Sequence, residues 1–152
     1  MRIVVQQADF DIAEEYARLR HDNPECGAIV TFSGLVRDLE KAQKVESLIL
    51  EHYPGMTEAS LEKIVHEAQG RWPVLDVTVI HRVGQLKVAE QIVFVAVASL
   101  HREAAFAAGE FIMDYLKTRA PFWKKCLDEN GESWVEAKAS DQDASERWQQ
   151  SS

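Results

Sequence analysis

The junction between residues 100–119 and the proline that follows them constrains the fold more than any other part of the chain. Ala105, Ile112 and Leu116 recur at the helical spacing of about 100° per residue, which predicts a long helix with an apolar stripe. Pro121 cannot continue that helix, and it disfavours helical geometry in the residue before it. We therefore expect a long helix that ends just before Pro121 and an extended chain after it.

Four cations crowd around this junction: Lys117, Arg119, Lys124 and Lys125. The chain as a whole is acidic, with 17 Lys and Arg residues against 25 Asp and Glu residues. Nucleic acid would meet repulsion over most of such a surface, whereas the local cluster could hold a small anion. In an extended chain Lys124 and Lys125 point to opposite faces. The sequence thus indicates a binding site for a small anionic ligand.

Lys117 has two interpretations. It follows Phe106 and Met113 along one edge of the predicted helix, so apolar surroundings could desolvate its ammonium group. Desolvation and neighbouring cations disfavour the charged form, which is how a lysine becomes a general base or nucleophile near neutral pH. Alternatively, its methylene chain lies along the core while the ammonium group reaches water. Position alone does not decide between these roles.

The composition is that of a globular domain. The chain has 152 residues, of which 46% are hydrophobic and 28% charged, and it is long enough to bury a core. No segment approaches the roughly 20 apolar residues of a membrane span, and residues 1–5 run into polar residues without a signal-peptide core. We therefore expect a cytoplasmic protein. Cys26 and Cys126 form no CxxC pair, so we expect two reduced thiols rather than a zinc or redox site.

Helices and strands are mixed along the chain, with hairpin-like strand pairs, which favours an α+β domain. Residues 38–44 are polar and lack a clear period, so we expect a mobile loop. The domain is expected to span residues 1–138, and residues 139–152 to form a polar tail that becomes ordered on binding a partner. We expect strands at residues 2–6, 26–36, 45–53, 74–83, 91–100 and 134–137, and helices from Asp9 or Asp11 to about His21, from Thr57 to about Gln69 and over residues 100–119. The core positions expected in the first two helices are Ile12, Tyr16, Leu19, Leu61, Ile64, Val65 and Ala68.

Several chemical motifs are absent from the sequence. It contains no GxxxxGK[ST], GxGxxG, HExxH or GxSxG pattern, so these forms of nucleotide binding, zinc proteolysis and serine hydrolysis lack their residues. His101 and Arg102 open the long predicted helix, where free backbone N–H groups and the helix dipole attract anions. Either residue could instead cover a strand edge. His81 and Arg82 end a predicted strand and are interpreted as structural, and no feature distinguishes His52.

Four longer stretches occur in order along the chain. They are LEHYPGMT at residues 50–57, VIHRVG at residues 79–84, SLHR at residues 99–102 and DYLKTRAPFWKK at residues 114–125. Together these long, unusual words at compatible spacing closely resemble the large, catalytic subunit of molybdopterin synthase. The match extends from about residue 3 to residue 148, and so covers nearly the whole chain.

The resemblance implies an α/β hammerhead fold with a mixed, largely antiparallel sheet, and a sulfurtransferase of molybdenum cofactor biosynthesis. A small ubiquitin-like carrier subunit would insert its C-terminal Gly-Gly thiocarboxylate into the large subunit. Its sulfur would be transferred to cyclic pyranopterin monophosphate (precursor Z) to form the dithiolene of molybdopterin. The resemblance also implies a homodimer of large subunits within a heterotetramer, and a large subunit that uses no metal and no cofactor.

The resemblance further implies roles for individual residues. Lys117 corresponds to a general acid or base near the thiocarboxylate, and Lys124 to an electrostatic stabiliser and substrate anchor. Cys126 and Lys138 stand where relatives are expected to carry an acidic residue and an arginine. The residues expected to bind substrate are Arg37, His101, Arg102, Lys117, Lys124, Lys125 and Cys126.

Two functions of other classes remain open: a scaffold that only binds the carrier, and a binding protein for a pterin or another small phosphate. The matching basic residues argue against the scaffold, which would have no use for Lys117. Arg102 and Lys117 lie on one helix edge, and 15 residues at a rise of about 1.5 Å place their backbones roughly 22 Å apart. If both serve one active site, we expect them to come from the two protomers of a two-fold dimer.

Overall fold

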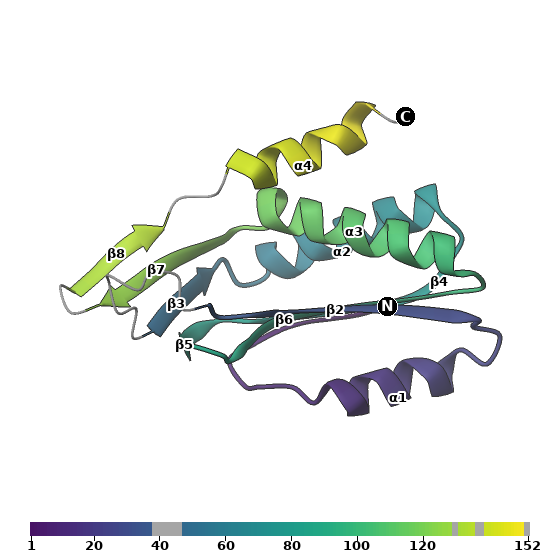
Figure 1. Ribbon diagram of the computed structural model, residues 1–152, viewed down its shortest axis with the longest axis horizontal. Helices are drawn as coiled ribbons and strands as arrows, with labels where there is room; N and C mark the ends of the chain where they lie inside the picture. The colour runs from purple at the N-terminus through teal and green to yellow at the C-terminus, as the bar shows by residue number, and fades with distance from the viewer. Residues whose placement is uncertain (38–46, 129–130, 136–138, 151–152) are drawn as a thin grey trace.

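The computed structural model describes residues 1–37, 47–128, 131–135 and 139–150. Over these ranges the chain forms two four-stranded sheets and four helices (Figure 1). The first sheet has the strand order β1-β4-β6-β2 and the second the order β5-β3-β7-β8. The strands are β1 Arg2–Gln6, β2 Ala28–Leu35, β3 Ser47–His52, β4 Val74–Arg82, β5 Gly84–Lys87, β6 Gln91–Ser99, β7 Phe122–Asp128 and β8 Gly131–Val135. The helices are α1 Ile12–Asp22, α2 Met56–Arg71, α3 Arg102–Arg119 and α4 Ala139–Gln150.

The centre of the first sheet is formed by β4 and β6, which are apolar along most of their length because both faces are covered. Alternation along β4 sends Val77 and Val79 into the core beneath α2 and α3, and Ile80 into a second core beneath α1. Strand β1 pairs parallel to β4, and every other described pair is antiparallel. The predicted α+β class with mixed, largely antiparallel strands is therefore confirmed.

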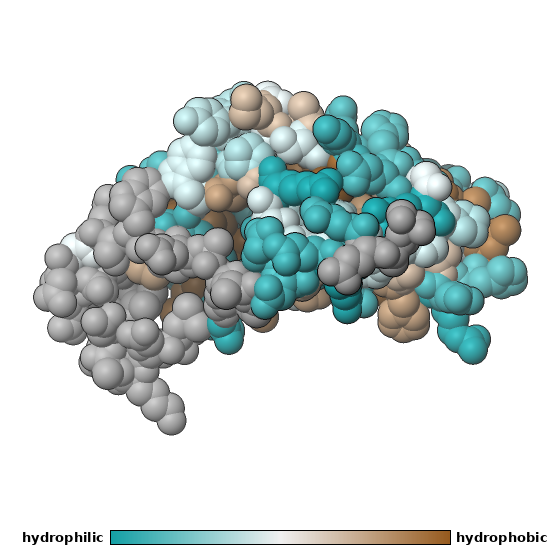
Figure 2. All heavy atoms as spheres, turned by 90° about the horizontal axis from the view of Figure 1, so that it is seen from above, coloured by the Kyte–Doolittle hydropathy of each residue, from teal (hydrophilic) through white to brown (hydrophobic). Residues whose placement is uncertain are grey.

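The helices cover the first sheet on both sides. Figure 1 shows α1 on one face and α2 and α3 on the other, with α4 lying across α3. Seen from the side of α4, hydrophilic residues cover much of the described surface (Figure 2). No described helix is long and apolar enough to cross a membrane.

The C-terminal segment folds back onto its own chain as α4. The Trp148 ring lies 5.5 Å from that of Trp72 and 5.6 Å from that of Phe111, and its Nε1 donates to Asp114 Oδ2 at 2.6 Å. The aromatic contacts of Trp148 join this segment to α3 and to Trp72 of the same chain. Its expected ordering on binding a partner stays a prediction. The domain boundary at residue 138 stays a prediction.

The chain passes from the first sheet to the second through a glycine corner. Gly84 has a φ of +90°, which a side chain would disfavour, and it turns the chain from β4 into the short strand β5. The sequence did not predict β5, because only Leu86 in it is buried. The other entry into the second sheet is β7, which begins directly after Pro121 as predicted. Helix α3 ends at Arg119, also as predicted.

The start of α1 confirms one prediction and corrects another. Asp11 caps the helix, since its side chain accepts a hydrogen bond from the Glu14 backbone N–H. Tyr16, expected in the core, is 39% exposed. Glu15 is buried in its place, because Arg2 and Arg18 neutralise its carboxylate with hydrogen bonds of 2.8 to 3.2 Å.

The start of α2 differs from the prediction that Thr57 caps it. The helix begins at Met56, and the Glu58 side chain accepts from the Gly55 backbone N–H at 2.6 Å. Thr57 is buried and donates its hydroxyl to the Tyr53 carbonyl. The four core positions predicted for α2 are all buried.

Two further predictions concern the ends of the described ranges. The expected loop at residues 38–44 lies outside the described residues. The last strand, predicted at residues 134–137, begins earlier, at Gly131, and is described to Val135.

Candidate functional site

Strand β7 places the neighbouring cations Lys124 and Lys125 on opposite faces, as predicted. On the Lys125 face, Trp123 Nε1 donates to Glu51 Oε2 at 2.8 Å, and Lys125 Nζ lies 3.2 Å from Glu51 Oε1. The hydrogen bonds from Trp123 and Lys125 lower the pKa of the Glu51 carboxyl. Lys125 thus points away from Lys124 and has a carboxylate partner within its own sheet.

The other face of β7 carries Phe122, Lys124 and Cys126. Residues directly opposite in an antiparallel pair share a face, so His52 and Leu50, the partners of Phe122 and Lys124, belong to it as well. The His52 and Phe122 rings are 6.3 Å apart. Cys126 packs against a small apolar cluster that includes Leu50. Lys124 is therefore flanked by an aromatic pair on one side and by apolar packing on the other.

His81 reaches this face from the first sheet. Its ring stacks on Phe122, with centroids 3.8 Å apart and an interplanar angle of 16°. Its Nδ1 lies 2.8 Å from the Arg82 carbonyl oxygen, which can only accept, so Nδ1 donates. Burial lowers the pKa of His81 to about 3 despite this hydrogen bond, and the nearby charges of Lys117 and Lys124 act in the same direction. His81 is uncharged at neutral pH.

Lys117 lies in the last turn of α3, where its charge is favourable for the helix dipole. Its side chain is exposed, and so is Phe106, at 62%, on the same edge of the helix. The desolvation expected for Lys117 is therefore not present within one chain. The reason is that α3 packs through its neighbouring stripe, where Ala105 and Ile112 are fully buried.

Arg37 lies at the same end of the first sheet as His81. Gly34 of β2 and His81 of β4 both pair with Val93 of the intervening strand β6, and Arg37 follows the end of β2. Its side chain is exposed. This is also the end of the molecule where α3 passes into β7 (Figure 1).

His101 and Arg102 lie at the opposite end of α3. His101 precedes the first turn and Arg102 begins it, and both are exposed. At a rise of about 1.5 Å per residue, their backbones are more than roughly 20 Å from Lys117. The structure therefore places Lys117, Lys124 and Arg37 at the C-terminal end of α3, whereas His101 and Arg102 lie at its N-terminal end. Lys138 lies outside the described residues.

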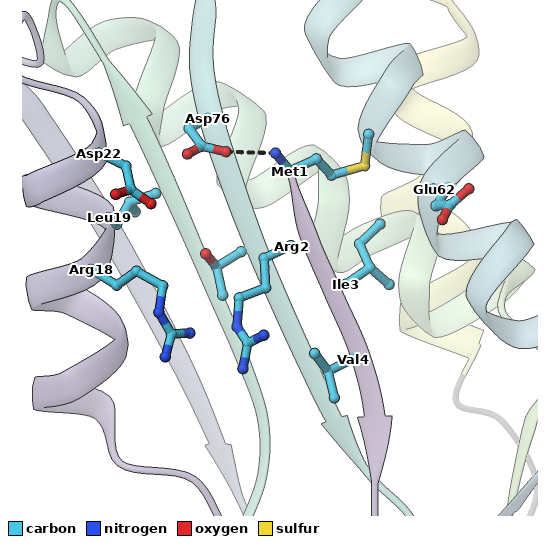
Figure 3. A pocket seen from close by; sticks show the side chains of 10 residues that line it. Met1, Arg2, Ile3, Val4, Arg18, Leu19, Asp22, Glu62 and Asp76 are labelled. Carbon is cyan, nitrogen blue, oxygen red and sulfur yellow. Dashed lines mark ion pairs between the residues drawn. The ribbon is translucent and has the colours of Figure 1, made fainter.

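A hollow of about 640 Å³ lies elsewhere, between α1 and the first strands of the first sheet (Figure 3). None of the predicted site residues lines it. Several of its charged groups pair with each other or with neighbours: the Met1 ammonium group lies 2.9 Å from Asp76, and Arg18 lies 2.8 Å from Glu15. We therefore place the site at the lysines and not in this hollow. Over the described ranges, no three His, Cys, Asp or Glu side chains are grouped to hold a metal ion.

The sequence reasoning missed the aromatic environment of the lysines. It treated His81 as structural and found no distinguishing feature in His52, but both belong to the group around Phe122. Strand alternation alone would have placed His81 on the same face as Val79. Its stacking on Phe122 could not be predicted, because the two residues belong to different sheets.

The model of the family described as "MoaE protein" matches residues 5–119. The chain belongs to the MoaE protein family. Within this family, the chain is 55% identical over 147 residues to the molybdopterin synthase catalytic subunit of Escherichia coli K12, covering 97% of both chains. A MoaE protein from Burkholderia ambifaria superposes with a TM-score of 0.83 at 52% identity, covering 97% of this chain and 98% of that one. The molybdopterin synthase structure from Staphylococcus aureus gives a TM-score of 0.79 at 34% identity, covering 87% and 95%.

Proposed function

We propose that this chain is the catalytic subunit of a molybdopterin synthase, and that the enzyme acts as a sulfurtransferase. The observation that carries the proposal is that Lys117 and Lys124, from α3 and β7, both lie near the buried His81. Two cations at one end of an acidic molecule suit an anionic substrate. The names of the relatives within the MoaE family support the same reaction.

In the proposed reaction, a small carrier subunit supplies sulfur from its C-terminal thiocarboxylate. The sulfur attacks the side-chain carbons of precursor Z, and two successive transfers form the dithiolene. After each attack, water cleaves the bond between the carrier's acyl carbon and sulfur, which leaves the sulfur on the pterin and a carboxylate on the carrier. The large subunit contributes binding, orientation and proton transfer, because the carrier supplies the nucleophile.

The lysines fit two different tasks in this reaction. Opening the cyclic phosphate develops negative charge on the leaving oxygen, and Lys124 stabilises that charge more strongly in the transition state than in the ground state. Lys117 transfers a proton near the thiocarboxylate. Its exposure in the single chain leaves room for the carrier tail, which would exclude water from the ammonium group and favour its neutral form.

The other predicted residues bind the pterin phosphate from several directions. Arg37 approaches from the end of the first sheet, and His101 and Arg102 approach from a second protomer. Cys126 lies on the Lys124 face of β7, whereas Lys125 reaches a ligand only around the strand or by leaving Glu51. We also propose a cytoplasmic location, in keeping with the expected reduced thiols.

A turnover assay tests the proposed function. We expect the chain to form molybdopterin from precursor Z when a thiocarboxylated carrier ending in Gly-Gly is added, and to form none by itself. Carrier with an ordinary C-terminal carboxylate is the matched control, because it binds without supplying sulfur. Conversion by the chain alone, without sulfide, would show that the sulfur source is wrong. Binding of precursor Z without turnover in the complete mixture would instead identify a binding protein.

A further inference from the structure

His81 connects the two sheets at a point where the charges of Lys117 and Lys124 both reach its ring. It belongs to β4 of the first sheet, and its ring stacks on Phe122, the first residue of β7 in the second sheet. Lys124 is two residues farther along β7 and therefore lies on the same face as Phe122. The stack between His81 and Phe122 thus links the face of β7 that carries Lys124 to the first sheet.

The His81 ring is held by the stack on Phe122 at its face and by a hydrogen bond at its edge. The hydrogen bond from Nδ1 to the Arg82 carbonyl anchors it to the end of β4. Arg82 is itself fixed, since its guanidinium group donates to the carbonyls of Gln7 and Gln91 at 3.0 to 3.1 Å. Only 5% of the His81 surface is exposed, so the ring has little freedom to turn. A flat side chain on a rigid strand end is suited to set the position of the strand that stacks on it.

We propose that His81 is a positioning residue: its ring, stacked on Phe122, holds the beginning of β7 against the end of β4 so that Lys117 and Lys124 face one substrate. This inference rests on the proposed function for its effect on turnover, but its effect on Lys124 does not. The ring positions β7 because it is flat and carries no charge, and it exchanges no proton with the substrate.

Two substitutions separate the ring from the hydrogen bond. His81→Phe keeps a flat, neutral ring for Phe122 but loses the donor to the Arg82 carbonyl. His81→Gln keeps a donor of similar reach but loses the ring. A merely structural residue would lower turnover in proportion to lost stability. A positioning ring instead predicts that His81→Phe keeps the rate whatever its melting temperature, whereas His81→Gln loses rate even at temperatures where it is fully folded.

The first measurement is steady-state turnover of both variants with thiocarboxylated carrier. We expect His81→Gln to lower kcat roughly tenfold or more with little change in KM, because displacement of a catalytic group by about 1 Å can reduce a rate 10²-fold. His81→Phe should stay within about threefold of wild type. His66→Gln is the control, since His66 is an exposed histidine of α2, and it should leave kcat unchanged.

The second measurement does not require turnover. Acylation of individual lysines by a small amine-reactive reagent is followed by mass spectrometry, with the exposed Lys63 of α2 as the internal reference. Lys124 should react at least about twofold faster in His81→Gln than in wild type, because the start of β7 is released. In His81→Phe it should react at the wild-type rate.

The outcomes distinguish the two hypotheses. If wild type does not turn over but the labelling pattern is as expected, the proposed function fails and the role of His81 in holding β7 stands. If wild type turns over and His81→Gln retains full kcat, or His81→Phe is as slow as His81→Gln, the inference about His81 is wrong and the function stands. Equal labelling of Lys124 in all three proteins also overturns it.

Discussion

Lys124 and Lys125 are adjacent in the sequence, but strand geometry gives them different surroundings. Lys125 shares the Glu51 carboxylate with Trp123, whereas Lys124 lies on the face of Phe122, toward His81. Cations that are neighbours in the sequence therefore have two separate environments in the folded chain. The other lysine whose charge reaches His81 is Lys117, from a different element.

Lys117 should matter for turnover and little for binding the carrier. If it transfers a proton, Lys117→Ala lowers kcat at least about 10²-fold, the usual scale for a general acid or base. Steady-state kinetics and a carrier-binding titration measure the two effects separately, with Lys63→Ala as the control on an exposed helix face. Near-normal turnover of Lys117→Ala would identify Lys117 as an ordinary solvated lysine.

His81 should make stability depend on pH. Its pKa falls from 6.5 in the unfolded chain to about 3 in the folded protein, so below about pH 6.5 the unfolded state binds the extra proton. The free energy of unfolding therefore falls as the pH falls from about 6.5 towards 3, by up to about 1.4 kcal/mol per pH unit from this residue.

Urea unfolding of wild type and His81→Gln between pH 7 and pH 4 measures this contribution. The variant should lose less stability over that range, while His66→Gln should follow wild type. The hydrogen bonds that lower the pKa of the partly buried Asp76 also weaken in acid, but they are common to all three proteins and cancel in the comparison. Identical pH dependence of wild type and His81→Gln would show that His81 is not held neutral.

At the scale of elements, glycine is required where the backbones of two elements pack closely, and secondary-structure propensity does not decide this. Gly27 precedes β2 and donates its backbone N–H to Ser99 at 3.0 Å, which brings it against Leu100 at the end of β6. A Cβ there would lie 2.2 Å from the Leu100 carbonyl oxygen. A Cβ at Gly70, near the end of α2, would meet no atom within 4 Å outside its own helix backbone. The two glycines should therefore respond oppositely to the same substitution.

Gly27→Ala should destabilise the protein by about 2 kcal/mol or more, because the clash is with backbone that cannot move aside. Gly70→Ala should stabilise it by roughly 0.5 to 1 kcal/mol, because alanine restricts the unfolded chain and favours the helix. Urea unfolding of both variants measures the difference. A stable Gly27→Ala protein would contradict the close approach between the start of β2 and the end of β6.

At the scale of the whole molecule, the exposed edges suggest how a second copy completes the site. β2 is the edge strand of the first sheet, and Phe32 and Leu35 on it are 44% and 51% exposed. Two copies aligned antiparallel along β2 would bring the Arg37 end of one protomer to the His101 end of the other.

Mixed dimers test whether the site is shared. Arg102→Ala and Lys117→Ala chains are each expected to be nearly inactive, but in a freely exchanged equimolar population half of the dimers are mixed. Each mixed dimer carries one fully wild-type site if the two residues come from different protomers, so activity should recover to roughly a quarter of wild type. Activity that stays at the level of the single variants after verified exchange would place both residues in one chain's site.

The sequence by itself determined the elements whose signals are local. The break at Pro121, the buried face of α2 and the opposite faces of Lys124 and Lys125 all follow from backbone geometry and periodicity. For the cap of α1 the sequence left Asp9 and Asp11 open, and the structure shows Asp11. The family also followed from the sequence, because several long motifs occur in order and at compatible spacing along the chain.

Only the tertiary structure decided which residues surround the lysines. Periodicity shows which side of an element is apolar, but not which other element packs against it. Periodicity therefore predicted that Tyr16 is in the core, but Tyr16 is exposed and Glu15 is buried instead. Glu15 can be buried because Arg2 and Arg18 donate hydrogen bonds to its carboxylate. His81 meets Phe122 because β4 and β7 belong to different sheets that join at the end of α3, a contact between residues 41 positions apart in the sequence. Its neutrality follows from burial, and burial is a property of the packed molecule.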